Sequence, residues 1–348
     1  MEIEYLKGSK KEFWEFVDLI TSRDKVAIMT HTDLDGLASA LFLEKLLNAK
    51  NIEVEYINFL NIKKDMVKEL NLELNKKEIT KVFFCDIAVE SIDFQGYEEL
   101  HKEMDVFVID HHPMKTDFGE FKNIIKTNSD DCAALTIFDL GEGIFDTKAW
   151  EWVVASAIFS DYSYKREENF EYLKSIYPNI SIENISSSIP GINGRKISSA
   201  LVYYKENIQV VYDLVKERNM EKLTELYEIV EEEVNKIVED FLENKKFYKT
   251  KDLYLYEVKS NFEVVSYSIG LVSKTSPEDT FVFYKRTKDG MIKFSARNQA
   301  KVKDMGELMR ICTQGLEGSS GGGHVPAAAA IIQENDFKEF KRRLTKNC

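Results

Sequence analysis

Residues 105–112 read Asp-Val-Phe-Val-Ile-Asp-His-His, an apolar run that ends in Asp110, His111 and His112. Four consecutive apolar residues between polar ones predict a buried β-strand. Two of the five histidines of the chain therefore lie where this strand gives way to a loop. Polar and ionisable groups are costly to place beside a core. Their concentration at such junctions is typical of a metal-dependent hydrolase.

The same pattern of an apolar strand followed by acidic or imidazole residues occurs twice more. Residues 25–30 lead into the sequence His-Thr-Asp-Leu-Asp-Gly at 31–36, and residues 81–86 end in Asp86. Ligands of open parallel sheets bind beyond the carboxyl ends of the strands. We therefore expect these side chains to meet at one edge, joined by Asp161 from the end of a predicted helix.

The first half of the chain alternates predicted strands and helices, which indicates an α/β fold. Its strands are apolar throughout rather than at alternate positions, which predicts a parallel sheet covered on both faces. The predicted strands are residues 25–30, 54–59, 81–86, 105–110 and 122–126, and the predicted helices are residues 37–49, 63–74, 131–140 and 147–159. Residues 187–194 contain proline and two glycines and are predicted to form a loop.

The second half begins with a long charged helical stretch over residues 208–244, whose apolar stripe predicts a connector packed between two domains. A coiled-coil interface with a partner is the alternative, although the heptads are few. A small α+β domain follows. Its predicted strands are residues 252–258, 279–284 and 291–296, the last two joined by an Asp-Gly hairpin turn, and its predicted helices are residues 305–313, 325–332 and 336–344.

Composition narrows the class of protein. A chain of 348 residues with 44% apolar residues fits two globular domains. The four scattered cysteines argue against a zinc knuckle and against a disulfide framework. A net charge of −13 disfavours a broad nucleic-acid-coating surface but is compatible with a cleft that binds a few phosphates. The charged N-terminus and the lack of a long apolar segment predict a cytoplasmic protein without a membrane span.

So many carboxylates at one sheet edge predict bound cations, because like charges raise each other's pKa. Two divalent ions about 3.5–4 Å apart would neutralise them, activate water and hold a phosphoryl group. Oxygen ligands with one or two imidazoles favour Mn²⁺ or Mg²⁺ over zinc. Taken singly, Asp33 or Asp35 could be a helix cap and Asp86 or Asp161 a surface acid. The prediction therefore depends on their joint placement.

The predicted C-terminal domain holds a second cluster. Residues 321–324 read Gly-Gly-Gly-His, and glycine amides can approach a phosphate closely, with the positive end of a helix from Val325 behind them. A flexible loop with a surface histidine is the alternative. A strand end with the sequence Ser295-Ala296-Arg297 could present the arginine guanidinium to a phosphate or carboxylate. The alternative is an exposed arginine at a strand end without a binding role.

These motifs resemble those of the DHH phosphoesterase family with a C-terminal DHHA1 domain. Residues 31–36 are similar to its first motif, in the H-x-D-x-D-G form typical of RecJ-like exonucleases. Asp86 is similar to the second motif, residues 110–112 to the third and Asp161 to the fourth. Residues 162–164, Tyr-Ser-Tyr, depart from the DxG-like context of the fourth motif.

The resemblance extends over nearly the whole chain. Residues 321–324 and 295–297 are similar to the glycine-histidine motif and the arginine strand of DHHA1 domains. It implies a DHH catalytic domain over residues 1–205, a helical connector over residues 206–248 and a substrate-binding DHHA1 domain over residues 249–348.

The resemblance also implies two Mn²⁺ ions, with Mg²⁺ as the alternative. By motif, one ion would be held by His31, Asp33 and Asp86. The second ion would be held by Asp35, Asp86, His111 and Asp161. Asp86 would thus be shared. His112 would stand just behind, near the scissile phosphate or orienting the ligand shell, and Asp86 and His112 would be the catalytic residues. The terminal nucleotide or its phosphate would be bound across the interdomain cleft by Ser295, Arg297, Gly322, Gly323 and His324.

The activity implied is that of a Mn-dependent, RecJ-like exonuclease that hydrolyses single-stranded DNA or RNA to mononucleotides. The short chain favours instead a nanoribonuclease or a phosphodiesterase of small nucleotides such as cyclic dinucleotides or pAp. A replication-associated scaffold is an alternative of another class, but the intact ligand set argues against it. The glycine-histidine motif argues against the pyrophosphatase branch of the family.

Expected partners are single-stranded nucleic acid or a short oligonucleotide, with replication or repair proteins as further candidates.

Overall fold

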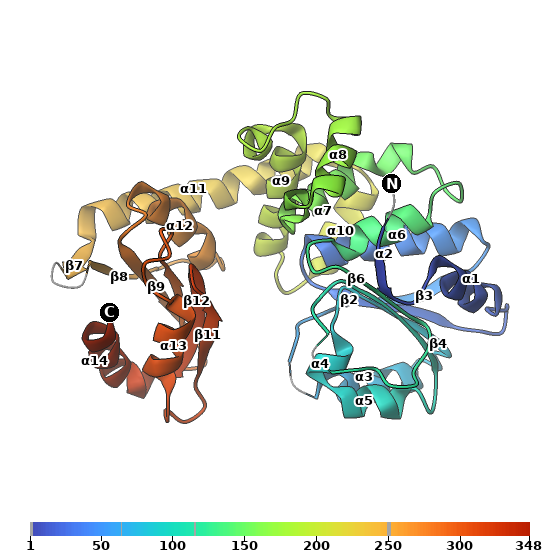
Figure 1. Cartoon of the computed structure of the whole chain (residues 1–348), viewed down its shortest axis with the longest axis horizontal. Helices are drawn as coiled ribbons and strands as arrows, with labels where there is room; N and C mark the ends of the chain where they lie inside the picture. The colour runs from blue at the N-terminus through green and yellow to red at the C-terminus, as the bar shows by residue number, and fades with distance from the viewer. Residues whose placement is uncertain (1–2, 64, 115, 249–251) are drawn as a thin grey trace. The chain divides into compact units, whose positions relative to one another are not determined.

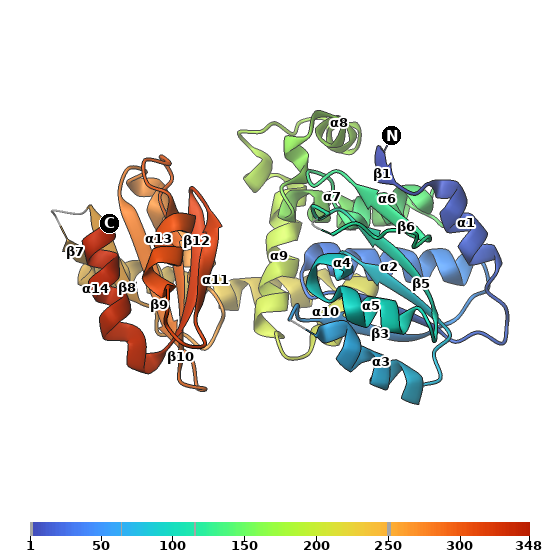
Figure 2. The same ribbon diagram turned by 60° about the horizontal axis from the view of Figure 1, so that its bottom comes forward.

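The computed structural model describes residues 3–63, 65–114, 116–248 and 252–348. The chain divides into two compact units, Met1–Tyr227 and Glu228–Cys348, here called unit 1 and unit 2. Each unit is built on one six-stranded sheet (Figures 1 and 2). This confirms the predicted α/β class with a second, smaller α+β unit. In the described residues, no helix is both long enough and apolar enough to cross a bilayer.

The sheet of unit 1 has the order β1-β6-β5-β4-β2-β3. Its strands are β1 (Tyr5–Lys7), β2 (Val26–His31), β3 (Val54–Leu60), β4 (Lys81–Cys85), β5 (Asp105–Asp110) and β6 (Ile124–Thr127). Strands β2 to β6 pair in parallel, as predicted, and β1 adds an antiparallel edge. The three residues of β1 are too few to have been recognised as a strand.

Helices cover both faces of this sheet. They are α1 (Lys10–Asp18), α2 (Leu34–Ala49), α3 (Met66–Lys76), α4 (Val89–Ile92), α5 (Phe94–Leu100), α6 (Ala133–Leu140), α7 (Glu151–Ser160), α8 (Glu167–Ile176), α9 (Ile189–Tyr203) and α10 (Ile208–Lys216). In β4, Phe83 belongs to the core formed with α1, α2, α6 and α7, while Phe84 belongs to the core formed with α3 and α5. Both faces of each central strand are thus buried, which explains the unbroken apolar runs.

Two predicted boundaries in unit 1 are wrong. Residues 189–194 form the start of α9 rather than a loop, because Ser188 caps the helix by accepting a hydrogen bond from the Gly191 amide and Pro190 stands in the first turn. Helix α2 begins at Leu34, three residues earlier than predicted, with Asp33 as its N-cap. Asp35 therefore belongs to the first turn of a helix rather than to a loop.

The helical stretch over residues 208–244 forms two helices, α10 and α11 (Met220–Asn244). Between them Arg218 has a left-handed backbone with φ 58°. The apolar stripe of α11 is buried within the chain: Leu223 and Leu226 join the core of unit 1, and Phe241 packs against aromatic rings of unit 2. This burial accounts for the stripe without a coiled-coil partner. The division between the two units falls inside α11, after Tyr227.

The sheet of unit 2 has the order β11-β12-β10-β9-β8-β7. Its strands are β7 (Lys246–Tyr248), β8 (Leu253–Glu257), β9 (Thr280–Arg286), β10 (Met291–Arg297), β11 (Ser320–His324) and β12 (Ala327–Gln333), and its helices are α12 (Val265–Val272), α13 (Met305–Thr313) and α14 (Phe337–Asn347). Only the β8–β9 pair is parallel among these strands as described. The predicted hairpin is confirmed, with Gly290 at φ +77° between β9 and β10.

The helix predicted over residues 325–332 is wrong. Residues 327–332 belong to β12, which pairs with β10 on one side and with β11 on the other. Four alanines at 327–330 favour a helix intrinsically, but pairing with two strands overrides this weak preference. The Gly-Gly-Gly-His run belongs to strand β11 and is followed by strand β12. The predicted phosphate site at the N-terminus of a helix starting at Val325 is therefore wrong.

Candidate metal centre and substrate-binding face

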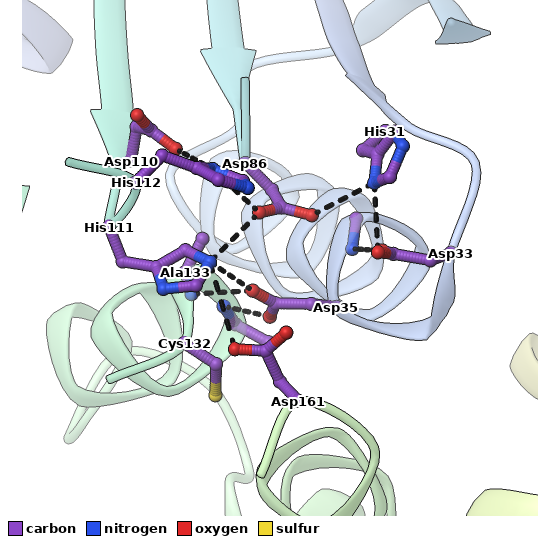
Figure 3. Close-up of polar contacts among 12 residues, drawn as sticks. His31, Asp33, Asp35, Asp86, Asp110, His111, His112, Cys132, Ala133 and Asp161 are labelled. Carbon is purple, nitrogen blue, oxygen red and sulfur yellow. Dashed lines mark hydrogen bonds and ion pairs between the residues drawn. The ribbon is translucent and has the colours of Figure 1, made fainter. Parts of the chain in front are cut away.

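Seven predicted site residues of unit 1 meet at the carboxyl edge of its sheet (Figure 3). They follow β2, β4 and β5 or lie at the ends of helices α2 and α7. They are His31, Asp33, Asp35, Asp86, His111, His112 and Asp161.

The first motif is folded by the junction of β2 and α2. His31 ends the strand, and its Nδ1 lies 2.8 Å from Asp33 Oδ2. The other oxygen of Asp33 accepts a hydrogen bond from the Gly36 amide at 3.0 Å, so Asp33 is both a helix cap and a site residue. Two residues further on, the carboxylate of Asp35 accepts hydrogen bonds from the amides of Ala133 and Ala134, each at 2.8 Å. The start of α6 thereby fixes Asp35.

Asp86 lies at the centre of the cluster and is 1% exposed. It directly follows β4 and has a left-handed backbone with φ 58°. Its Oδ2 is 3.7 Å from His31 Nδ1, and its Oδ1 is 3.3 Å from His111 Nε2. His111 Nε2 is also 3.7 Å from Asp35 Oδ2 and 3.7 Å from Asp161 Oδ2. Asp86 thus contacts both halves of the cluster.

The electrostatics of this cluster favour cations. Burial raises the pKa of Asp35 well above its ordinary value, and the charges of Asp86 and Asp161 raise it further. Burial, reinforced by Asp86, raises the pKa of Asp161 to about 6. Although burial opposes their charge, the surrounding carboxylates raise the pKa of His31 and of His111 to about 10. The negative charge around these imidazoles is therefore of the kind that suits bound metal ions.

The donor set fits divalent metals. Asp86 Oδ2 is buried at the centre and makes no hydrogen bond within the described part of the chain. The cluster contains three groups of residues whose potential ligand atoms, within each group, lie within 4.8 Å of one another. These groups are His31 with Asp33 and Asp86, Asp35 with His111 and Asp161, and Asp86 with His111 and His112. Carboxylate oxygens with one or two imidazoles suit Mn²⁺ or Mg²⁺.

The sequence reasoning missed Lys126 and Glu90, which lie behind His112 and the Asp110 of the third motif. His112 Nδ1 lies 2.8 Å from Asp110 Oδ1, and Lys126 of β6 contacts the other oxygen of Asp110. Lys126 is 2% exposed and its Nζ lies 3.0 Å from Glu90 Oε1. A lysine next to two isoleucines in a predicted strand was the available signal, because a buried lysine requires charged partners.

The predicted substrate-binding residues of unit 2 lie on neighbouring strands. Arg297 pairs across Ala327 with His324, and Ser295 pairs across Ala329 with Gly322. Residues in such cross-strand rows share one face of a sheet. Gly323 pairs with Ala328, between the two rows, so it belongs to the other face.

A cavity of about 430 Å³ lies at this part of the sheet. Its lining includes Ser295 and Gly322, the hydroxyl residue Ser266 of α12, and the charged residues Glu263 and Lys293.

The glycine run has a partly structural cause. A β-carbon on Gly321 would lie 2.5 Å from the Met309 carbonyl oxygen of α13, and Gly323 has φ +142°. A β-carbon on Gly322 would meet nothing closer than the Arg310 side chain at 4.0 Å. Packing against α13 thus requires the first glycine and backbone conformation favours the third, whereas Gly322 borders the cavity.

Family models match both units. Residues 25–169 match the DHH family N-terminal domain, and residues 250–348 match the DHHA1 domain. The chain therefore belongs to the DHH family, with a DHHA1 domain after its DHH domain. Its DHH domain carries an acidic cluster suited to divalent metals.

Solved structures share this fold at low identity. RecJ from Thermus thermophilus in complex with Mn²⁺ is similar with a TM-score of 0.72 and 15% identity over 99% of this chain and 55% of that chain. The chain thus spans about half the length of that RecJ. An exonuclease RecJ bound to manganese has a TM-score of 0.67 and 14% identity, over 100% and 96% of the two chains. An exopolyphosphatase-related protein from Bacteroides fragilis has a TM-score of 0.60 and 17% identity, over 99% and 98%. No curated protein matches the chain significantly.

Proposed function

We propose that this chain is a Mn²⁺-dependent phosphodiesterase that hydrolyses single-stranded DNA or RNA from one end to mononucleotides. The observation that carries the proposal is the buried Asp86 carboxylate, which lies between two groups of potential metal ligands. A phosphodiester carries negative charge that a purely acidic cluster would repel. Cations are therefore required before a substrate of this kind can bind.

We assign one ion to His31, Asp33 and Asp86, and a second to Asp35, Asp86, His111 and Asp161. When bound, two such ions activate water and neutralise charge on the phosphoryl group. The chain itself holds the ligands in place, since the start of α6 fixes Asp35 and the cap of α2 fixes Asp33. His112 is bound to Asp110 through Nδ1, which leaves Nε2 as the nitrogen that we assign to a phosphoryl oxygen.

Substrate binding is assigned to the face of unit 2 that carries Arg297, Ser295, Gly322 and His324, with the Gly323 backbone as a further contact. A guanidinium and an imidazole in one cross-strand row suit a terminal phosphate. Such local contacts allow a chain with net charge −13 to bind a polyanion.

A nanoribonuclease or small-nucleotide phosphodiesterase is the second candidate. The cavity of about 430 Å³ favours it, because that volume lies at the lower end of small-molecule sites. The intact ligand set argues against the scaffold alternative.

A substrate length series tests the proposal. End-labelled DNA and RNA, from dinucleotides to strands of many nucleotides, are incubated with Mn²⁺ and with EDTA. We expect laddering of long strands with Mn²⁺ and none with EDTA, and the labelled end gives the polarity. Cleavage of only the shortest substrates would replace the proposal by the small-nucleotide candidate. Failure to cleave any substrate with Mn²⁺ would favour the scaffold.

His324→Ala is expected to lower kcat/KM about tenfold, chiefly through KM, because a hydrogen bond to a charged group contributes about 1.5–3 kcal/mol. Mn²⁺ affinity measured by calorimetry should stay at the parent value. Val325→Ala, at the exposed neighbouring position, is the matched control. Unchanged kinetics of the His324 variant would remove this residue from the substrate-binding face.

A further inference from the structure

A lysine is buried in the core of unit 1, behind the candidate metal centre. The side chain of Lys126 on β6 is 3% exposed. Its Nζ contacts Asp110 Oδ2 and lies 3.0 Å from Glu90 Oε1. It also donates to the carbonyl oxygen of His112 at 3.1 Å. A buried ammonium is costly unless paired in this way.

These contacts form a chain from Glu90 through Lys126 and Asp110 to His112. Lys126 holds His112 twice: through its backbone carbonyl, and through the Asp110 carboxylate that binds its ring. The Nδ1 of His112 lies 2.8 Å from Asp110 Oδ1, whereas its distance to Asp86 Oδ1 is 3.7 Å. The closer contact to Asp110 fixes the orientation of the ring.

We propose that Lys126 is a positioning residue for His112, and that Glu90 holds Lys126 in place and balances its charge. Lys126 does not touch the seven clustered residues except through the His112 carbonyl and Asp110. Its expected effect is therefore on the orientation of His112 and not on metal binding. The catalytic consequence rests on the proposed function, in which His112 contacts the substrate.

The choice of variants must allow for the buried charges. Lys126→Met alone leaves Glu90 and Asp110 buried without a cation, which is strongly destabilising. The double variant Lys126→Met with Glu90→Gln removes one charge of each sign, and Lys126→Arg keeps the cation. Lys81→Met is the matched control, because Lys81 is also a shielded strand lysine, 10% exposed in its side chain and paired with Asp105. Lys81 begins β4 and Asp105 begins β5, so this pair lies at the opposite edge of the same sheet.

The kinetic test compares kcat, KM and Mn²⁺ affinity in these variants. We expect the double variant to lose about 10- to 100-fold in kcat, the usual loss when a residue supporting a ligand or catalytic group is removed. Its KM and its Mn²⁺ affinity by calorimetry should match the parent, Lys126→Arg should recover part of kcat, and Lys81→Met should be unaffected. A double variant with parental kcat, or one whose Mn²⁺ affinity falls as much as its kcat, overturns the proposal.

A measurement that needs no turnover separates this proposal from the proposed function. In protein labelled with ¹⁵N-histidine, we expect the His112 ring to carry a hydrogen-bonded Nδ1–H in the parent, and this signal to shift in the double variant but not in Lys81→Met. If the parent cleaves no nucleic acid but the signal shifts, the proposed function fails while the positioning role stands. An unshifted signal refutes the positioning role whatever the substrate.

Discussion

Asp86→Asn is expected to lower turnover by about 1,000-fold or more while leaving the protein folded. The Asp86 carboxylate is assigned to both proposed metal sites and lies 3.7 Å from His31 Nδ1 and 3.3 Å from His111 Nε2, so its replacement weakens both sites at once. A loss of about 4 kcal/mol of transition-state stabilisation corresponds to that factor, and metal ions contribute several kcal/mol in such centres.

Asparagine is the informative replacement because Asp86 has φ 58°. Asparagine tolerates the left-handed region, whereas alanine there adds backbone strain. Removal of the charge also relieves repulsion with Asp35 and Asp161, whose pKa values Asp86 raises. We therefore expect an unfolding temperature near that of the parent in the absence of metal, and Asp86→Ala to be equally inactive but less stable.

The measurements are turnover with Mn²⁺, Mn²⁺ binding by calorimetry and thermal unfolding with EDTA. Asp139→Ala provides the control, because Asp139 is also a buried acid of unit 1 but is paired with Lys10 and lies outside the three ligand groups. Near-parental turnover of Asp86→Asn would refute the assignment of the metal centre.

The central parallel strands of unit 1 could be predicted from the sequence because a strand that is buried on both faces of its sheet consists of consecutive apolar residues. Each central strand of unit 1 appears as an unbroken apolar run, and the end of each run marks the sheet edge where Asp86 and His111 lie. The convergence of these residues followed from the rule that parallel strands present their carboxyl ends at one edge. No long-range contact had to be known.

Where long-range contacts decide the structure, the sequence was insufficient. The alanines of β12 adopt a strand because β10 and β11 lie on either side, a fact that local propensity does not contain. The partners of Lys126 are 36 residues away at Glu90 and 16 residues away at Asp110, so only folding reveals that they meet. The glycines of β11 were interpreted as phosphate-binding, whereas Gly321 is required by the backbone of α13.

Gly36→Ala is expected to disable the metal centre through the backbone alone. A β-carbon at this position would lie 2.3 Å from the carbonyl oxygen and 2.8 Å from the amide nitrogen of His31. The Gly36 carbonyl is itself held by the Thr30 hydroxyl at 2.7 Å. Both contacts tie the first turn of α2 to the end of β2, so the added methyl group must push the two elements apart.

The consequence is a change in stability and in site geometry together. Overpacking of this kind lowers the free energy of unfolding by about 1–3 kcal/mol. His31 lies on one side of the junction, and Asp33 and Asp35 lie on the other, so their separation changes. A displacement of about 1 Å can cost about 100-fold in rate. We expect at least that loss of turnover, together with weaker Mn²⁺ binding.

Gly270→Ala is the control for the substitution itself, since Gly270 lies in helix α12 and a β-carbon there would meet nothing within 4 Å. It should leave turnover unchanged and stabilise the protein by up to about 1 kcal/mol, because alanine is favoured over glycine inside a helix. Thermal unfolding, Mn²⁺ calorimetry and turnover are measured on both variants. If Gly36→Ala behaved like Gly270→Ala in all three, the close contact between α2 and β2 would not be what holds His31 beside Asp33.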